Sequence, residues 1–281
     1  AGVAAERVHV HNCFLGGGFG RRSMNDELIQ AVTVAKAVGK PVKLIWTRET
    51  DMQHNRYRPM AVLRARGRIG ADGEIEALQF QTVVGSILGS LGWQRGSPGG
   101  IEPMAVSGLS DQAYAAKNLL VEAALKNTHI PVMFWRSVGY SQNTFVMESF
   151  IDELAHAAGE DPYQFRRKLL ANEPEWLRVL DTVAEKSGWG TPLPKGRGRG
   201  IAIHMSHDTI LAEVAEVAVT PGGEVRVERV VAVADPGWVI NPRLIEMQVE
   251  SGIIYGLTRR CTAPLPSRRA PSSRAISTIT A

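Results

Sequence analysis

The spacing of apolar residues in the first fifty positions predicts a strand, a helix and a second strand. Apolar and polar side chains alternate over residues 5–13, and a largely apolar run typical of a buried strand occupies residues 41–46. Between them, apolar positions recur every three or four residues from Asn25 or Asp26, either of which suits a helix N-cap, to a stop at Gly39. A glycine-rich segment separates the first strand from the helix.

Alternation also predicts a hairpin, with strands at residues 62–68 and 75–84 and a turn at residues 71–74. The three arginines Arg64, Arg66 and Arg68 share one face, which is either a phosphate-binding ridge or a solvated sheet face. Residues 85–110 are rich in glycine and serine and too long for a simple connector. Such a length is typical of active-site lids or disordered loops.

The second half of the chain carries clear signals for helices and strands. Helices are predicted at residues 145–158, from Asp161-Pro162, at residues 174–186 and, after Asn241-Pro242, at residues 243–256, and strands at residues 201–204, 210–219 and 224–234. Residues 191–200, rich in proline, glycine and basic residues, are interpreted as a mobile linker. Asp152 and Glu153 are adjacent on a helix, which favours a helix surface or an ion pair between helices over a catalytic carboxylate dyad.

Composition places the chain among globular proteins of one or two domains, with 44% hydrophobic and 21% charged residues in 281. The net charge of +4 comes from one end: residues 258–281 hold five arginines and no acidic residue, so the remainder has 27 basic and 28 acidic residues. We therefore expect no nucleic-acid partner. No apolar run is long enough to predict a membrane span, which leaves a cytoplasmic and a periplasmic location both open.

Several metal and catalytic classes are disfavoured. Two cysteines exclude a disulfide framework and a cysteine-ligated iron–sulfur cluster within the chain. His9 and His11 share a strand face but have no recognisable third metal ligand, and His204 and His207 are not expected to share a face. A hydrolase is disfavoured because the chain has no Gly-x-Ser-x-Gly elbow.

The segment from Phe14 to Arg22 carries the main ligand-binding signal. Its glycines at positions 16, 17, 18 and 20 leave backbone amides open to a bound anion, and a helix N-terminus follows. It is neither a dinucleotide fingerprint, because Arg21 stands where the third glycine is needed, nor a P-loop, because Gly-Lys-Ser/Thr is absent. The alternative is a tight turn without a ligand.

This segment, with its Arg21-Arg22 ending and acidic helix start, resembles the Gly-Gly-Gly-Phe-Gly motif of the large, molybdenum-bearing subunit of molybdenum hydroxylases, of the isoquinoline oxidoreductase beta-subunit type. Further matching segments follow in the same order. They are residues 46–49 with Asp51, Tyr57-Arg58-Pro59, Trp135-Arg136-Ser137-Val138-Gly139, residues 148–155, Asp161-Pro162, Asp235 with Gly237, Asn241-Pro242 and Gln248-Val249-Glu250. Ser251 stands where the family usually has glycine.

The resemblance implies an α+β fold of mixed sheets with packed helices, arranged as two molybdopterin-binding subdomains of the molybdenum hydroxylase type. We expect a first molybdopterin-binding region at residues 1–172, an incomplete second region at residues 173–257, and a disordered or aberrant tail at residues 258–281. The short linker after Trp189 fits the isoquinoline oxidoreductase type, in which a long cofactor-loop segment lies nearer the N-terminus. This linker implies that upstream sequence is missing, and residues 258–281, which have no counterpart in the family, imply that downstream sequence is missing as well, so that the chain resembles a fragment truncated at both ends.

The resemblance also implies a molybdenum–molybdopterin cofactor in the cytosine dinucleotide form, and with it a set of contacts. The implied cofactor-binding residues are Gly17, Gly18, Phe19, Gly20, Arg136, Gln142, Gln248 and Gly252. The implied reaction is hydroxylation, with water as oxygen source, of a carbon in an N-heteroaromatic ring or of an aldehyde carbon. Electrons would pass to a small two-iron two-sulfur subunit.

No catalytic residue is assigned within the chain. In the family the catalytic base is the glutamate of a Gly-Glu-Pro turn, and residues 258–281 contain no glutamate. We therefore expect this chain alone to bind the cofactor weakly and to be inactive. The alternative is a catalytically dead fragment that serves only as a scaffold or subunit-docking module.

Overall fold

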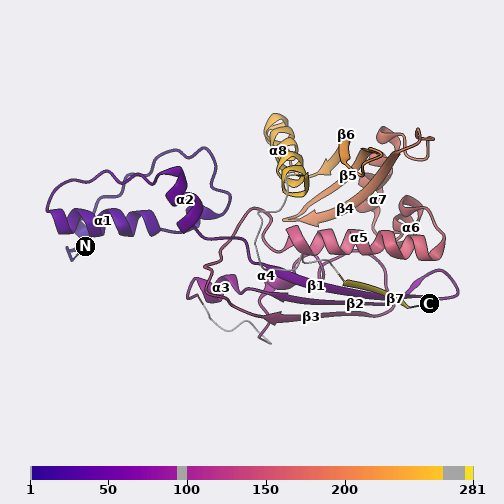
Figure 1. Ribbon diagram of the computed structural model, residues 1–281, viewed down its shortest axis with the longest axis horizontal. Helices are drawn as coiled ribbons and strands as arrows, with labels where there is room; N and C mark the ends of the chain where they lie inside the picture. Colours follow the sequence, from indigo (N-terminus) through magenta and orange to yellow (C-terminus); the bar gives the residue numbers. More distant parts are fainter. Residues whose placement is uncertain (1, 94–99, 262–275, 281) are drawn as a thin grey trace. The chain divides into compact units, whose positions relative to one another are not determined.

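The computed structural model describes residues 2–93, 100–261 and 276–280 (Figure 1). The chain forms two compact units, each assembled from separate segments. Unit 1 contains Ala1–Ala61, Val84–Ala105 and Leu125–Val138, and unit 2 contains Val62–Val83, Val106–Ala124 and Gly139–Ala281. The chain therefore passes from one unit to the other five times.

Unit 1 consists mainly of helices and irregular segments. Its elements are the 3-10 helices η1 (Ala5–Arg7) and η2 (Arg21–Ser23), the helices α1 (Asp26–Val38), α2 (Arg48–His54) and α3 (Ile87–Ser90), and most of α4 (Pro103–Val106). The first predicted helix is confirmed as α1, with Asn25 as N-cap and Gly39 in the left-handed conformation at the C-cap. Helix α2 begins after Thr47, whose hydroxyl caps it by accepting from the Thr50 amide at 3.2 Å.

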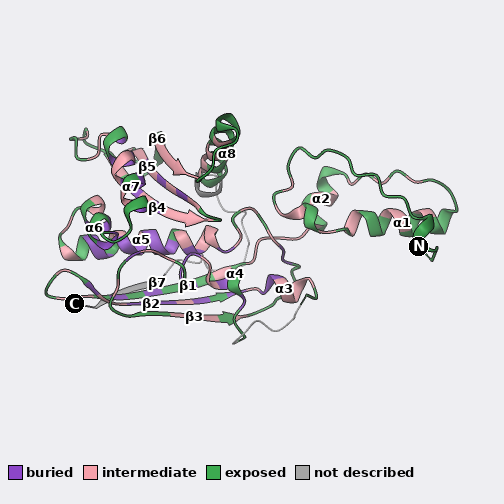
Figure 2. Cartoon of the chain, turned by 180° about the vertical axis from the view of Figure 1, so that it is seen from behind, coloured by how far each residue is buried: buried purple, intermediate pink, exposed green. Residues whose placement is uncertain are grey.

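The two strands predicted at residues 5–13 and 41–46 are wrong. Neither segment enters a β-ladder, and Val8, Val10 and Ile45 are 51%, 74% and 72% exposed. A strand is stabilised by a hydrogen-bonded neighbour, and no described segment pairs with either stretch; residues 5–13 are also exposed throughout, whereas Val42, Leu44 and Trp46 are half-buried on one face. Helix α1 likewise buries none of its side chains (Figure 2).

Unit 2 contains two sheets and four longer helices. The first sheet has the order β3-β2-β1-β7, formed by β1 (Ala61–Ile69), β2 (Ile75–Val84), β3 (Leu119–Leu125) and β7 (Ile276–Thr280), and β7 is parallel to β1. The second sheet is antiparallel with the order β4-β5-β6, formed by β4 (Arg197–Ser206), β5 (Thr209–Val219) and β6 (Val225–Asp235). The helices are α5 (Tyr140–Ala158), α6 (Pro162–Leu169), α7 (Pro174–Ser187) and α8 (Pro242–Cys261).

The predicted hairpin is confirmed as β1 and β2. Every second residue of β1 from Leu63 to Gly67 is buried, while the three alternating arginines are exposed. Arg68 pairs with Glu76 of β2 at 3.0 Å. The arginines therefore form a solvated sheet face.

Helix α5 is the centre of the unit 2 core and lies between the two sheets (Figures 1 and 2). Its Phe150 meets Phe80 of β2 edge to face, with ring centroids 6.1 Å apart, and on the other side the Ile203 amide of β4 donates to its Glu148. Phe150 is 1% exposed and Leu154 fully buried. Because full burial of such a side chain contributes roughly 2 kcal/mol, this helix is a main stabiliser of unit 2.

Two element boundaries correct the predictions. Helix α5 begins at Tyr140 rather than residue 145, because the buried Asn143 side chain donates to the Ser107 carbonyl at 2.8 Å and draws this turn into the fold. Strand β4 begins at Arg197, inside the predicted linker, because Arg199 pairs with Glu216 of β5 at 2.9 Å and supports the ladder.

The glycine- and serine-rich loop of residues 85–110 contains α3 and α4. Glu102 is buried there, and its carboxylate accepts from the Ser86 hydroxyl at 2.5 Å and the Ile87 amide at 3.0 Å. These bonds order the flanks of the loop, where a lid or disorder was expected. Residues 94–99 lie outside the described part.

Mixed sheets with packed helices confirm the predicted α+β class. The division into residues 1–172, 173–257 and 258–281 stays a prediction. In the last segment, α8 continues to Cys261 and Ile276–Thr280 forms β7, whereas residues 262–275 and 281 are not described. No helix in the described ranges is long and apolar enough to cross a membrane.

Candidate functional site

The glycine loop of unit 1 has a backbone shape that requires glycine at its last position. Gly20 has a φ of 99°, and a side-chain carbon added to it would lie 2.4 Å from the carbonyl oxygen of Phe134. Phe19 also has a positive φ, 50°, which is uncommon for a residue with a side chain. Strain of this kind gathers at ligand-binding and catalytic sites, so the loop is a candidate site on its geometry alone.

The turn around Arg136 lies directly against this loop. The Arg136 amide donates to the Phe19 carbonyl, with 3.0 Å between nitrogen and oxygen. Ser137 and Val138 have φ values of 66° and 43°, and Arg58 holds their turn by donating to the carbonyls of Val138 at 2.8 Å and Arg136 at 2.7 Å. Two turns far apart in the sequence are thus joined within unit 1, and the Tyr-Arg-Pro segment supplies the residue that secures one of them.

The eight predicted cofactor residues are divided between the units. Gly17, Gly18, Phe19, Gly20 and Arg136 lie in unit 1, and Gln142, Gln248 and Gly252 lie in unit 2. Gln142 is on the first turn of α5, and its side-chain oxygen is buried with no hydrogen-bond partner among the described residues. Gln248 and Gly252 are exposed and four residues apart, on the same side of α8.

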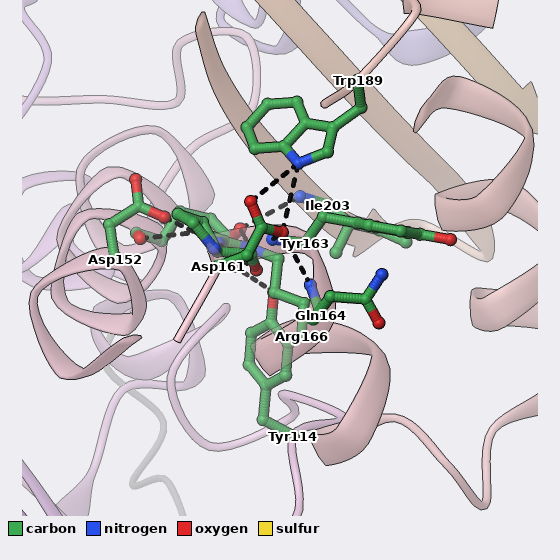
Figure 3. Close-up of polar contacts among 10 residues, drawn as sticks. Tyr114, Asp152, Asp161, Tyr163, Gln164, Arg166, Trp189 and Ile203 are labelled. Atoms are coloured by element: carbon green, nitrogen blue, oxygen red, sulfur yellow. Dashed lines mark hydrogen bonds and ion pairs between the residues drawn. The ribbon is translucent and has the colours of Figure 1, made fainter. Parts of the chain in front are cut away.

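Unit 2 also contains an ion-pair network whose burial the sequence patterns did not predict (Figure 3). The fully buried Arg166 side chain donates from Nε to Glu148 at 3.0 Å and from Nη1 to Asp152 at 2.6 Å, which confirms an ion pair between helices for Asp152. Glu148 also accepts from the Tyr114 hydroxyl at 2.8 Å and the Ile203 amide at 3.0 Å. Burial raises the pKa of Tyr114, which keeps this hydroxyl a donor. Because the Glu148 carboxylate is saturated by donors, the network is structural.

A second polar cluster surrounds the β4–β5 turn. The Tyr140 hydroxyl donates to Asp111 at 2.8 Å, and its ring centroid lies 5.2 Å from that of His204 and 5.8 Å from that of His207. Burial lowers the pKa of His204 to about 4, so this histidine is neutral at pH 7. Neither this cluster nor any other group in the described part of the chain gathers three metal-ligating side chains.

Family comparison explains why the glycine loop and the Arg136 turn occur together. Residues 1–170, which include both, match a molybdopterin cofactor-binding domain, and residues 164–259 match a second such domain. The chain belongs to the molybdopterin cofactor-binding family. Two successive domains of this kind confirm the predicted pair of molybdopterin-binding subdomains and the resemblance to molybdenum hydroxylases.

Three bacterial relatives are longer than this chain, which aligns with only part of each of them. It is 31% identical to the beta subunit of isoquinoline 1-oxidoreductase of Brevundimonas diminuta, over 92% of this chain and 34% of the relative. It is 32% identical to the membrane-bound aldehyde dehydrogenase (pyrroloquinoline-quinone) of Gluconacetobacter polyoxogenes, over 91% and 37%. It is 29% identical to a nicotinate dehydrogenase subunit of Pseudomonas putida KT2440, over 90% and 23%. The chain thus spans about a third of these relatives or less.

A solved structure supports the same fold. The aldehyde oxidoreductase of Desulfovibrio gigas superposes with a TM-score of 0.50 at 20% identity, over 76% of this chain and 25% of that protein. Together, the family matches and these relatives identify the chain as a molybdopterin-binding region similar to parts of isoquinoline 1-oxidoreductase and nicotinate dehydrogenase. The bacterial relatives support a bacterial origin.

Proposed function

We propose that the chain holds a molybdenum–molybdopterin cofactor in its cytosine dinucleotide form. The proposed contacts are Gly17, Gly18, Phe19, Gly20 and Arg136 in unit 1 and Gln142, Gln248 and Gly252 in unit 2. The observation that carries the proposal is the hydrogen bond from the Arg136 amide to the Phe19 carbonyl, which joins a strained glycine loop to an arginine-bearing turn. Backbone amides and an arginine are donors that suit phosphate groups.

Two further observations fit a flat, polar ligand. Apart from its two chain neighbours, no described residue has an atom within 4 Å of a side-chain carbon added at Gly16, so a ring system can approach the loop backbone there. The buried Gln142 oxygen has no partner among the described residues, and buried polar atoms are rarely left unpaired. A cofactor amide or amine would satisfy it.

The proposed contacts assign the redox chemistry to the cofactor and its binding to the residues of this chain. When bound, the cofactor supplies two-electron oxidation of a carbon atom, with oxygen taken from water. The loop amides hold its anionic groups, while Arg136, Gln142 and Gln248 hydrogen-bond to its polar edges. We infer an N-heteroaromatic or aldehyde substrate and a separate two-iron two-sulfur subunit as electron acceptor, since relatives are named for isoquinoline, nicotinate and aldehydes and two are named as subunits.

Cofactor analysis tests this proposal. The chain is expressed in a host that synthesises the cofactor, purified, and assayed for molybdenum by mass spectrometry and for pterin by fluorescence after oxidation. We expect molybdenum and pterin both to be present in the wild-type chain. Phe19→Ala removes a proposed cofactor contact and should lower both contents on the order of tenfold, the size of effect seen when a residue next to a metal site is lost. Phe14→Ala is the matched control, because Phe14 lies in the same loop and is fully exposed. A wild-type chain without molybdenum or pterin would favour the scaffold or docking function instead.

Activity is expected to be absent from this chain by itself. The family places its catalytic base in a Gly-Glu-Pro turn, and the sequence contains no such tripeptide. Substrate-dependent reduction of a dye by the purified chain, measured with an aromatic heterocycle and with an aldehyde, would contradict this expectation.

A further inference from the structure

The two arginines that follow the glycine loop have different environments. The Arg21 side chain is 17% exposed, whereas Arg22 is an exposed residue. Both carry the same charge and are adjacent in sequence. If the loop needs only positive charge nearby, both arginines should contribute. If it needs a side chain held in a fixed position, only Arg21 should contribute.

Arg21 is held by side chains from two helices of unit 1. Its Nη2 pairs with Asp26 at 3.2 Å and Glu27 at 3.0 Å, both in the first turn of α1. Its Nε donates to the Asn55 side-chain oxygen at 2.5 Å, at the C-terminal end of α2. Its guanidinium carbon lies 6.0 Å from the Trp46 ring centroid, within reach of a cation–π contact.

The partners of Arg21 are themselves fixed. Asp26 also pairs with Arg56 at 3.2 Å, and the Asn55 amide group donates to Asp51 at 2.6 Å. These second contacts orient Asp26 and Asn55 towards the guanidinium, as supporting groups orient a ligand side chain. The two acidic residues Asp26 and Glu27 and the two basic residues Arg21 and Arg56 also balance one another in charge, which leaves little net attraction for a phosphate.

The backbone of Arg21 closes the loop that its side chain anchors. The Arg21 amide donates to the Gly18 carbonyl at 2.9 Å, and the residue before it is Gly20, whose positive φ and close approach to Phe134 require glycine. We propose that Arg21 is a positioning residue: by tying this closing turn to α1 and α2, it holds the amides of the glycine loop in their ligand-binding arrangement. The inference rests on the proposed cofactor binding but assigns Arg21 a role through the loop rather than through contact with the cofactor.

The test compares matched substitutions at the two arginines. Arg21→Gln, Arg21→Lys, Arg22→Gln and Arg22→Lys are made in this chain, and cofactor retention is measured as molybdenum per protein during dialysis. We expect both Arg21 variants to lose the cofactor on the order of tenfold faster, because lysine keeps the charge but cannot reproduce the planar fork. Both Arg22 variants should behave as wild type.

A double-variant cycle tests whether Asn55 acts through Arg21, and loop hydrogen exchange separates positioning from direct contact. Asn55→Ala removes a partner of Arg21 and should also speed cofactor loss, while Arg21→Gln with Asn55→Ala should lose it no faster than Arg21→Gln alone. If Arg21 contacted the cofactor directly, Arg21→Gln would release the cofactor without raising hydrogen exchange of the loop amides. Hydrogen exchange of the loop amides provides a second readout, expected to rise at least threefold in Arg21→Gln and to stay unchanged in Arg22→Gln.

The outcomes distinguish the two proposals. A wild-type chain without cofactor would reject the proposed function, and the hydrogen-exchange comparison would still decide the positioning role. Equal cofactor loss in the Arg21 and Arg22 variants, full retention by Arg21→Lys, or unchanged loop exchange in Arg21→Gln would overturn the inference.

Discussion

Replacing Arg166 with methionine tests the buried network of unit 2. The guanidinium is fully buried and makes ion pairs with Glu148 at 3.0 Å and Asp152 at 2.6 Å. Methionine occupies a similar volume, so the substitution mainly leaves the buried Glu148 carboxylate without its cation. Breaking one side of a buried pair costs about 3–5 kcal/mol, and we expect the free energy of unfolding to fall by that amount.

The measurement is urea denaturation at pH 7, followed by far-ultraviolet circular dichroism. Arg167→Met is the matched control: Arg167 is the next residue of α6 and pairs with Asp181 at 2.9 Å, with the two side chains 49% and 36% exposed. Because solvent screens such a pair, its loss should cost less than about 1 kcal/mol. If Arg166→Met does not fold, Arg166→Lys supplies a milder change with the same sign.

A double variant completes this test. Glu148→Gln removes the carboxylate charge, so Glu148→Gln with Arg166→Met should cost less than the two single substitutions together, by about 1–3 kcal/mol. The reasoning is refuted if Arg166→Met costs no more than Arg167→Met, or if the effects of the Glu148 and Arg166 substitutions simply add.

Two further predictions concern the loop and the β4–β5 turn. Gly20→Ala forces a side-chain carbon against the Phe134 carbonyl, so hydrogen exchange of the amides of residues 134–138 should increase. Gly39→Ala is the control, because Gly39 also has a positive φ but has open space around it, and this variant should leave that exchange unchanged. Equal exchange in both variants would count against the contact between Gly20 and Phe134. The pKa of His204 is lowered by burial from 6.5 to about 4, so the unfolded chain binds the extra proton and about 3 kcal/mol of stability is lost as the pH falls from 6.5 to 4. His204→Gln should remove that loss in urea titrations across this range and His207→Asn should not, and identical pH profiles for wild type and His204→Gln would exclude it.

Helices were the part of the fold that local sequence signals predicted well. Asp161 caps α6 by accepting from the amides of Tyr163 at 3.0 Å and Gln164 at 3.1 Å, and Gly159 ends α5 in the left-handed conformation. Such signals act within a few residues, so they can be recognised without knowledge of the fold. The glycine loop was recognisable for the same reason.

Features that depend on distant partners could not be predicted in this way. Residues 5–13 have the alternation of a strand, yet no described segment pairs with them. Arg166 and Arg167 are indistinguishable by residue type, and only the packing of α6 against α5 decides which one is buried. The approach of Gly20 to Phe134 likewise depends on two turns meeting, which spacing along one chain does not reveal.

The repeated passage of the chain between its two units has a consequence for synthesis on the ribosome. Unit 1 cannot fold completely until its third segment, Leu125–Val138, has been synthesised, and by then the first two segments of unit 2 have already been made. Unit 2 in turn needs its third segment, Gly139–Ala281, so neither unit can complete its folding before synthesis of the other has begun. Their maturation is therefore interleaved in time rather than sequential. A single cut anywhere between Val62 and Val138 would leave both units incomplete, so neither half of such a cut chain should reach the native state without its complement.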